Sequence, residues 1–377
     1  MTQTKLYLLT GSGGVGKTTL SAAWALALAE QDQRVALITI DPAKRLAQSL
    51  GLDALNDTLS PTKIHPKLWA MMLDQRATSE RLVLTYASSR ESAENILKNR
   101  YYQAFSRSLA GVQEMMAIHE VHQALSCGEY DAVVLDTPPA QHALDLLDVP
   151  ERLRSALDSS ALRWLLDDQA QTHDHFKSKV DPRSGGGIRA SLSGLSRTVA
   201  LKAFTKITAG QFLEDLLDFL RLFSDVLRRI TTSGQTLERA LRGENAEIWV
   251  VSSAHAAPLR AAAMVSDQLE ARAYRVNTWL INRAPIGLCG DLPAMVLHSA
   301  SEQIRESLGH DAELHALVLS LVQQEIDRAK DAAQLLKNYE ETRRLFLISE
   351  RLDDHTPLSI VRSLSEELLN LGLHQPN

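Results

Sequence analysis

The chain has 377 residues, of which 45% are hydrophobic and 23% charged, so it can bury one large core or two ordinary ones. A formal net charge of −6, without a basic stretch, argues against nucleic acid as the main partner. No run of about 18 apolar residues occurs, which argues against stable membrane insertion. The two cysteines form no Cys-x-x-Cys pair and the sequence does not begin like a signal peptide, so we expect a cytoplasmic protein.

The first predicted strand, residues 5–10, runs directly into a glycine-rich loop over residues 11–19. Glycines let several backbone N–H groups converge on one phosphate, and the helix predicted over residues 18–29 would point its positive end at the same anion. This is the spacing of a P-loop, in which Lys17 reaches the β- and γ-phosphates and the Thr18 hydroxyl binds Mg²⁺. We therefore expect ATP and Mg²⁺ as cofactors. The residues expected to contact the nucleotide here are Gly13, Gly14, Val15, Gly16, Lys17, Thr18 and Thr19.

A second buried strand is predicted over residues 34–40, one helix after the first, which makes a βαβ unit with parallel strands. Asp41 follows at the carboxyl end of this strand, so its carboxylate should face the P-loop. We expect Asp41 to orient the attacking water or to hold a water bound to Mg²⁺. Its alternative role is an N-cap for the segment over residues 44–50.

The third predicted strand, residues 131–137, contains Asp136 near its end. A carboxylate at the end of an apolar strand is the Walker B arrangement, in which Asp136 coordinates Mg²⁺ or accepts a hydrogen bond from a water on it. The loop over residues 137–142 would then sense the γ-phosphate. The predicted metal site consists of Thr18, Asp41 and Asp136.

The segments from about 76 to 125 and from 151 to 243 read mostly as helices, and they predict a helical subdomain inserted between the core strands of a single domain over residues 1–377. Glycine and polar residues in the segment 169–192 predict a mobile loop. Apolar side chains recur at helical spacing over residues 212–227. This stripe is either core or one wall of a groove for an apolar client helix.

Further buried strands are predicted over residues 247–252, 278–282 and 344–348, which completes a doubly wound, mainly parallel α/β sheet. Asn282 ends the second of them, with Arg283 beside it. An amide at this place can pair with both a donor and an acceptor on adenine, so Asn282 is the predicted adenine reader. Its alternative is a turn-forming asparagine ahead of a proline.

The motifs at residues 13–19, 41–43 and 136–147 resemble those of the ArsA-type anion-transporting ATPases, in the deviant Walker A branch of P-loop proteins. The likeness extends to residues 68–74 and 109–114 and covers most of the chain. It implies an enzyme that binds Mg·ATP and hydrolyses it to ADP and phosphate. It also implies a homodimer that acts as a nucleotide-driven switch for a client, which we cannot name from the sequence.

One departure concerns Ser12, because the family places there a lysine that reaches across the dimer to the partner's phosphates. One hypothesis is that Arg45, or Lys44, supplies the missing charge. The alternative is that both are solvated helix residues and that the enzyme is slow. The candidate catalytic residues are therefore Asp41, Lys17 and Arg45. Two alternatives stay open, a nucleotide-dependent binding module with little hydrolysis and a partitioning ATPase of the MinD/ParA type, which shares the glycine loop.

Overall fold

The computed structural model describes residues 4–40, 45–103, 112–159, 210–276, 278–285, 288, 312–340, 343–350 and 356–373. Asp41, Lys44 and the expected mobile loop over residues 169–192 therefore lie outside the described residues. The chain divides into two compact units. The sheet unit comprises residues 1–74, 113–148 and 233–377, and the helical unit comprises residues 75–112 and 149–232.

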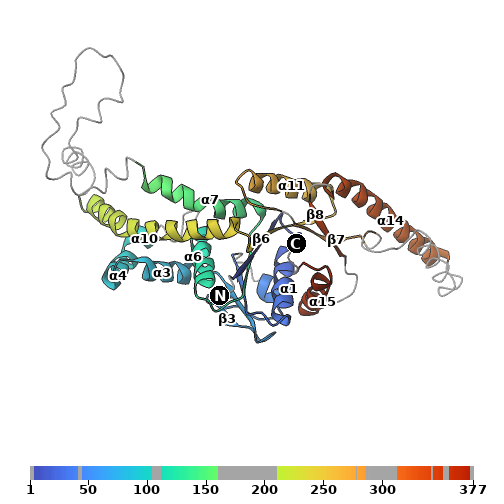
Figure 1. Cartoon of the computed structure of the whole chain (residues 1–377), viewed down its shortest axis with the longest axis horizontal. Coiled ribbons are helices and arrows are strands. Elements are labelled where there is room, and N and C mark those ends of the chain that lie inside the picture. Colours follow the sequence, from blue (N-terminus) through green and yellow to red (C-terminus); the bar gives the residue numbers. More distant parts are fainter. Residues whose placement is uncertain are drawn as a thin grey trace, which may run out of the picture. The chain divides into compact units, whose positions relative to one another are not determined.

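The sheet unit contains one eight-stranded sheet in the order β3-β4-β2-β5-β1-β6-β7-β8, which is drawn in Figure 1. Only the pair β3–β4 is antiparallel. The α/β class with a mainly parallel sheet is thus confirmed. The strands are β1 (Lys5–Gly11), β2 (Val35–Thr39), β3 (Ser60–Pro61), β4 (Leu68–Met72), β5 (Ala132–Asp136), β6 (Ala246–Ser253), β7 (Thr278–Ala284) and β8 (Arg344–Ser349).

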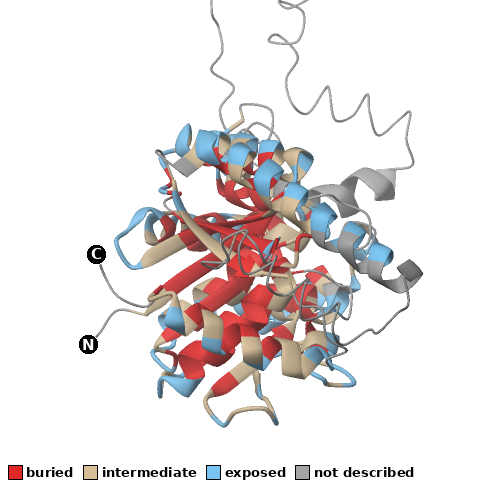
Figure 2. Ribbon diagram, turned by 90° about the vertical axis from the view of Figure 1, so that its right-hand side faces the viewer, coloured by how far each residue is buried: buried red, intermediate tan, exposed pale blue. Residues whose placement is uncertain are grey.

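Helices pack on the sheet because its strands are apolar on both sides, as parallel strands usually are. α1, α2 and α15 cover one face of the sheet and α11 packs against β6. Figure 2 shows the resulting buried layer with half-exposed helices around it. The helices described are α1 (Lys17–Glu30), α2 (Arg45–Ser49), α3 (Gln75–Tyr86), α4 (Arg90–Lys98), α6 (Val112–Ser126), α7 (Ala140–Leu157), α10 (Gly210–Arg242), α11 (Ala256–Glu270), α14 (Ala312–Glu340) and α15 (Pro357–Asn370).

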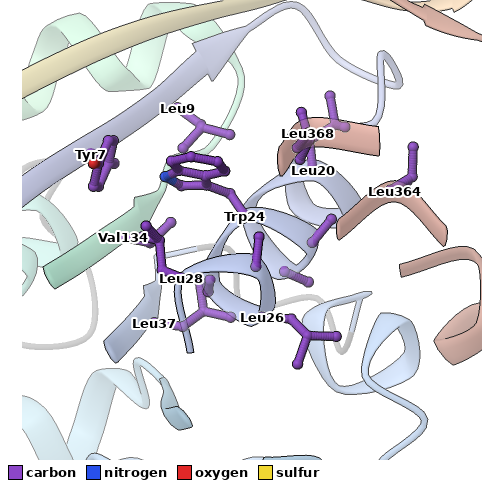
Figure 3. Packing of buried hydrophobic residues seen from close by; sticks show 14 of the residues in the cluster. Tyr7, Leu9, Leu20, Trp24, Leu26, Leu28, Leu37, Val134, Leu364 and Leu368 are labelled. Atoms are coloured by element: carbon purple, nitrogen blue, oxygen red, sulfur yellow. The ribbon is translucent and has the colours of Figure 1, made fainter. Parts of the chain in front are cut away.

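The core beneath the glycine loop is built around α1, whose alanines and leucines are buried nearly all round. Trp24 of this helix is fully buried, and its ring lies 5.4 Å from that of Tyr7 and 4.8 Å from that of Trp249. Figure 3 shows Trp24 between the strands and the helix. Truncating so large a buried ring typically costs about 3–5 kcal/mol. The aromatic cluster therefore fixes the position of α1 against the sheet, and with it the position of the loop that precedes α1.

The terminal helix α15 packs along α1. Leu364 and Leu368 join the same core as Leu20 (Figure 3), and the Ser365 hydroxyl donates to Glu30 Oε2 at 2.8 Å. Sequence patterns alone do not predict this contact, because it joins residues that lie 335 positions apart. Its consequence is that α15 borders the loop between β1 and α1.

The helical unit has its own small aromatic core. Phe219 and Phe223 stack with ring centroids 5.1 Å apart, and Tyr102 meets Phe223 edge-on at 6.0 Å. All three side chains are buried, so this part of the predicted apolar stripe is core. The side chains over residues 210–217 lie outside the described part. The unit is also narrower than the expected subdomain, since residues 113–125 and 233–243 group with the sheet.

Among the described helices, no stretch is both long and apolar enough to cross a bilayer.

Candidate functional site

The loop between β1 and α1 depends on glycine at two close approaches. A Cβ on Gly11, which has φ 153°, would collide with the carbonyl oxygen of Val251 in β6. A Cβ on Gly16, which has φ 95°, would collide with the side-chain amide nitrogen of Asn282. Both glycines also adopt a backbone conformation that other residues rarely reach. The path of the loop therefore depends on close contacts with β6 and β7 as well as on its own turns.

Lys17 lies at the first turn of α1 and is 93% buried, with an exposed fraction of only 7%. Its ammonium group donates to the backbone carbonyl of Ser12 at 2.9 Å, so the charge is folded back over the loop. The hydroxyl of Ser12 is buried and has no hydrogen-bond partner among the described residues. The hydrogen bond to the loop backbone thus holds the positive charge of Lys17 beside the glycine loop.

An open cavity of about 510 Å³, which we call the phosphate cavity, lies over this loop. It combines N–H groups of the loop with two cations and the hydroxyls of Thr18 and Thr19. Such a lining suits a polyanion. The lining residues are Gly13, Gly14, Gly16, Lys17, Thr18, Thr19, Arg45, Gln48, Ser49, Thr137, Pro139 and Pro357.

Asp136, at the end of β5, is completely buried under the phosphate cavity. It accepts hydrogen bonds from the hydroxyls of Thr39 at 2.9 Å and Ser21 at 3.2 Å, and from that of Thr18. Burial raises the pKa of this carboxyl to about 6, while the hydrogen bonds from Thr39 and Thr18 and the charge of Lys17 oppose the rise. Asp136 therefore holds its proton more tightly than an exposed carboxyl does, and a cation bound beside it would favour the ionised form.

Thr18 and Asp136 provide two hard oxygen ligands side by side. No group of three or more histidine, cysteine or acidic side chains within the described ranges could hold a metal by itself. Mg²⁺ usually takes one or two protein oxygens and completes its shell with phosphate oxygens and waters. The donor set therefore fits Mg²⁺ delivered with a nucleotide, and fits a dedicated protein-only metal centre poorly.

Asn282 lies at the carboxyl end of β7, and only 8% of it is exposed. Its amide nitrogen donates to the backbone carbonyl of Val15 at 2.8 Å and thereby clamps the loop. One N–H and the carbonyl oxygen of the amide remain for another partner. Beside it, Arg283 has φ 53° where the β7–β8 register shifts, so a strained backbone turns the strand end at this point.

The structure brings most of the predicted site residues together. The glycines, Lys17, Thr18, Thr19 and Arg45 surround the phosphate cavity, with Val15 buried beneath it. Asn282 and Arg283 line a second cavity that also contains Gly16 and Thr19. Asp41 lies outside the described residues, so its role stays a prediction.

Sequence reasoning missed Ser21 and Thr39 as partners of Asp136. A polar residue closing an apolar strand was the available signal for Thr39, which lies directly beside Asp136 in the parallel register. Ser21 lies four residues after Lys17 and therefore on the same face of α1.

The model of the anion-transporting ATPase family matches residues 4–175. Over these residues, which make up fewer than half of the 377, the sequence is similar to that family. An ATPase ASNA1 homolog of Dictyostelium discoideum is 32% identical over 156 residues, which cover 41% of this chain and 44% of the relative. A putative arsenical pump-driving ATPase of Prosthecochloris vibrioformis is 32% identical over 160 residues, or 40% and 36% of the two chains. ATPase GET3 of Rhodotorula glutinis is 31% identical over 153 residues, or 41% and 43%.

The chain thus spans less than half the length of these curated relatives. The segment matched to the anion-transporting ATPases contains the glycine loop, α1 and Asp136. It ends before β7, β8 and α15. The phosphate cavity is therefore built largely from the matched segment, whereas most of the second cavity comes from outside it.

Proposed function

We propose that this chain binds Mg·ATP and hydrolyses it to ADP and phosphate. The observation that carries the proposal is the convergence of Lys17, Thr18 and Asp136 on one side of a cavity floored by the glycine loop. A lysine charge and a row of backbone N–H groups match a triphosphate, and the paired oxygens match the Mg²⁺ that accompanies it. The relatives named above are ATPases by their descriptions, which supports the same conclusion.

The roles follow from position for the described residues and from the sequence motif for Asp41. Lys17 binds the β- and γ-phosphates, while Thr18 and Asp136 hold Mg²⁺, which when bound offsets the charge of the phosphates. Asp41 orients a water for in-line attack on the γ-phosphorus, and the bond to the β–γ bridging oxygen breaks as ADP leaves. Asn282, with Arg283 beside it, contacts the adenine. Because Asp41→Asn keeps the shape but removes the orienting carboxylate, we expect turnover to fall about 10²-fold with ATP affinity within about tenfold.

Hydrolysis would be coupled to a movement of α7. Thr137 and Pro139 line the phosphate cavity, the Thr137 hydroxyl donates to the Leu9 carbonyl at 2.8 Å, and α7 begins at the next residue, Ala140. α7 begins in the sheet unit and contains Pro150. Loss of the γ-phosphate can therefore displace the N-terminal end of α7. We propose that this makes the protein a nucleotide-driven switch, and that it works as a homodimer on an apolar client helix or another protein partner.

A second candidate is a nucleotide-dependent binding module that hydrolyses ATP barely at all. Ser12 favours it, because this residue offers only a hydroxyl and a carbonyl where a further cation would stabilise the transition state.

Steady-state turnover and sedimentation, measured together with and without Mg·ATP, separate the two candidates. An efficient ATPase turns over continuously and its dimer dissociates as ATP is consumed. A binding module stays dimeric with ATP and releases phosphate at a rate near that of a Lys17→Ala variant.

A further inference from the structure

The second cavity has a volume of about 340 Å³, and we call it the base cavity. It shares Gly16 and Thr19 with the phosphate cavity, so a molecule whose phosphates bind the glycine loop can extend into it. Its walls combine two apolar side chains from α15 with polar groups from the ends of β7 and β8. The lining residues are Gly16, Thr19, Asn282, Arg283, Ser349, Glu350, Ile360 and Leu364.

Of the strands that contribute to this cavity, β8, which precedes Glu350, lies farther from β1 than β7 does. Glu350 follows β8, which is the third strand from β1 across β6 and β7. Neighbouring strands lie about 4.8 Å apart, so Glu350 is on the order of 14 Å from the strand that leads into the glycine loop. An extended nucleotide presents its base, not its ribose, at that separation.

The carboxylate of Glu350 is held in place from two sides. Its backbone N–H donates to the Ala284 carbonyl at 2.9 Å, and its Oε2 accepts a hydrogen bond from Arg328 at 2.9 Å. Arg328 is in turn fixed by Glu325, also at 2.9 Å. Among the described residues, none donates to Oε1 of Glu350. About 30% of the side chain is exposed, so one oxygen is anchored and the other is accessible.

We propose that Glu350 reads the nucleobase by accepting a hydrogen bond from the 6-amino group of adenine. This inference rests on the proposed function. An ionised carboxylate is an acceptor only, so it pairs with the amino group of adenine and faces the carbonyl oxygen of a 6-oxo purine unfavourably. Asn282 cannot make this choice alone, because its clamped amide still presents both one N–H donor and a carbonyl acceptor. Ile360 and Leu364 supply an apolar wall for the ring.

The test compares the affinities of Mg·ATP, Mg·ITP and Mg·GTP by titration calorimetry. Inosine triphosphate carries oxygen where adenine carries the amino group and lacks the 2-amino group of guanine. We expect the parent to favour ATP over ITP by about tenfold or more. Glu350→Ala should reduce the ratio to about threefold or less, and Glu350→Gln, whose amide can turn its donor to the oxygen, should reduce it as well.

Glu270→Gln is the matched control, because it alters a carboxylate paired with a different arginine, Arg343, and does not line the base cavity. Its ATP-to-ITP ratio should equal that of the parent. An unchanged ratio in both Glu350 variants overturns the proposal. A parent that prefers GTP also overturns it, since the carboxylate would then read the N1–H and 2-amino donors of guanine. ATP binding that depends on Lys17 but shows no preference for adenine contradicts only the base reading, whereas ATP binding that ignores Lys17→Ala contradicts the proposed function itself.

Discussion

The phosphate cavity and the base cavity meet at Gly16 and Thr19, yet they are assembled in opposite ways. Half of the residues that line the phosphate cavity come from one short stretch of chain, in which a glycine loop leads directly into a helix. The base cavity is gathered from the ends of two later strands and from α15. Local backbone geometry determines the glycine-loop part of the phosphate cavity, whereas the base cavity forms only after distant segments have packed.

The two cavities should therefore also recognise different parts of a nucleotide. Backbone N–H groups and one lysine bind any polyphosphate, because every nucleoside triphosphate presents the same anion. Side chains such as Asn282 and Glu350 meet the part of the ligand that varies. General affinity should therefore depend on the phosphate cavity, and choice between nucleotides on the base cavity.

The largest expected effect is on the phosphate side. Lys17→Ala should weaken Mg·ATP binding by about 10²-fold or more, because a charge-assisted hydrogen bond to a buried anion contributes about 1.5–3 kcal/mol or more. The loss should be equal for ATP, ITP and GTP, measured by calorimetry. Lys67→Ala, which removes a surface lysine paired with Asp32, is the control and should bind normally. ATP binding of unchanged strength in Lys17→Ala would show that the glycine loop is not a phosphate site.

Asp136→Asn should distinguish what this carboxyl contributes to the stability of the fold from what it contributes to Mg²⁺-dependent ATP binding. Because burial raises the pKa of Asp136 to about 6, the folded chain holds this proton more tightly than the unfolded chain does. The stability that the group contributes is therefore present at low pH and lost as pH rises through about 6, by roughly 2–3 kcal/mol for a shift of about two pKa units.

The asparagine variant does not titrate at this position. In urea unfolding without metal or nucleotide, the parent should lose stability relative to Asp136→Asn between about pH 4 and pH 6.5, the interval between the unfolded and the folded pKa. The same variant should lose Mg²⁺-dependent ATP binding. Parallel stability profiles for the two proteins would mean that the carboxyl is not the buried acid described above.

Much of the sheet could be predicted, because parallel buried strands leave continuous apolar runs in the sequence. The predicted strands over residues 34–40 and 344–348 match β2 and β8 within a residue or two. β3 was missed, since two residues at a sheet edge carry no periodic signal. Residues 113–125 were read correctly as helical, but their grouping with the sheet unit depends on tertiary contacts such as the hydrogen bond from Gln113 to the Ile40 carbonyl.

The site divides in the same way. Lys17 and Thr18 could be placed from their spacing, because the loop and helix that position them are local. The hydrogen bond from Asn282 to Val15 could not, because it joins residues 267 positions apart across two strand crossovers. Glu350 gave no signal at all, since a single acidic residue after a strand is common. Its position in the base cavity follows only from the pairing of β8 with β7.

Asn282→Ala tests the one side chain that works on both cavities. Without the hydrogen bond to the Val15 carbonyl, the glycine loop loses a buried clamp and an acceptor is left unsatisfied, which costs about 1–3 kcal/mol. We expect ATP affinity to fall about tenfold, with a lower melting temperature for the nucleotide-free protein. Asn56→Ala, which removes an exposed amide bonded to Ser60 outside both cavities, is the control and should change neither quantity by more than about twofold or a degree. An Asn282→Ala protein with parental stability but weak ATP binding would assign the residue to the base alone.

The smallest effect we predict concerns Arg45, the cation on the outer wall of the phosphate cavity. Phosphoryl transfer spreads negative charge over the γ-phosphate and the leaving oxygen, and a guanidinium can stabilise it with two hydrogen bonds. Arg45 is exposed, so solvent screens its charge and its contribution should be well below that of a buried cation. We expect Arg45→Ala to lower turnover about fivefold to tenfold at saturating Mg·ATP, with affinity nearly unchanged. Adding Ser12→Lys, which restores a positive charge to the loop, to the Arg45→Ala protein should restore its turnover. If neither Arg45→Ala nor Lys44→Ala slows hydrolysis while Ser12→Lys alone raises it sharply, no side chain here replaces the missing lysine, and the protein is a slow nucleotide switch whose two cavities serve binding rather than catalysis.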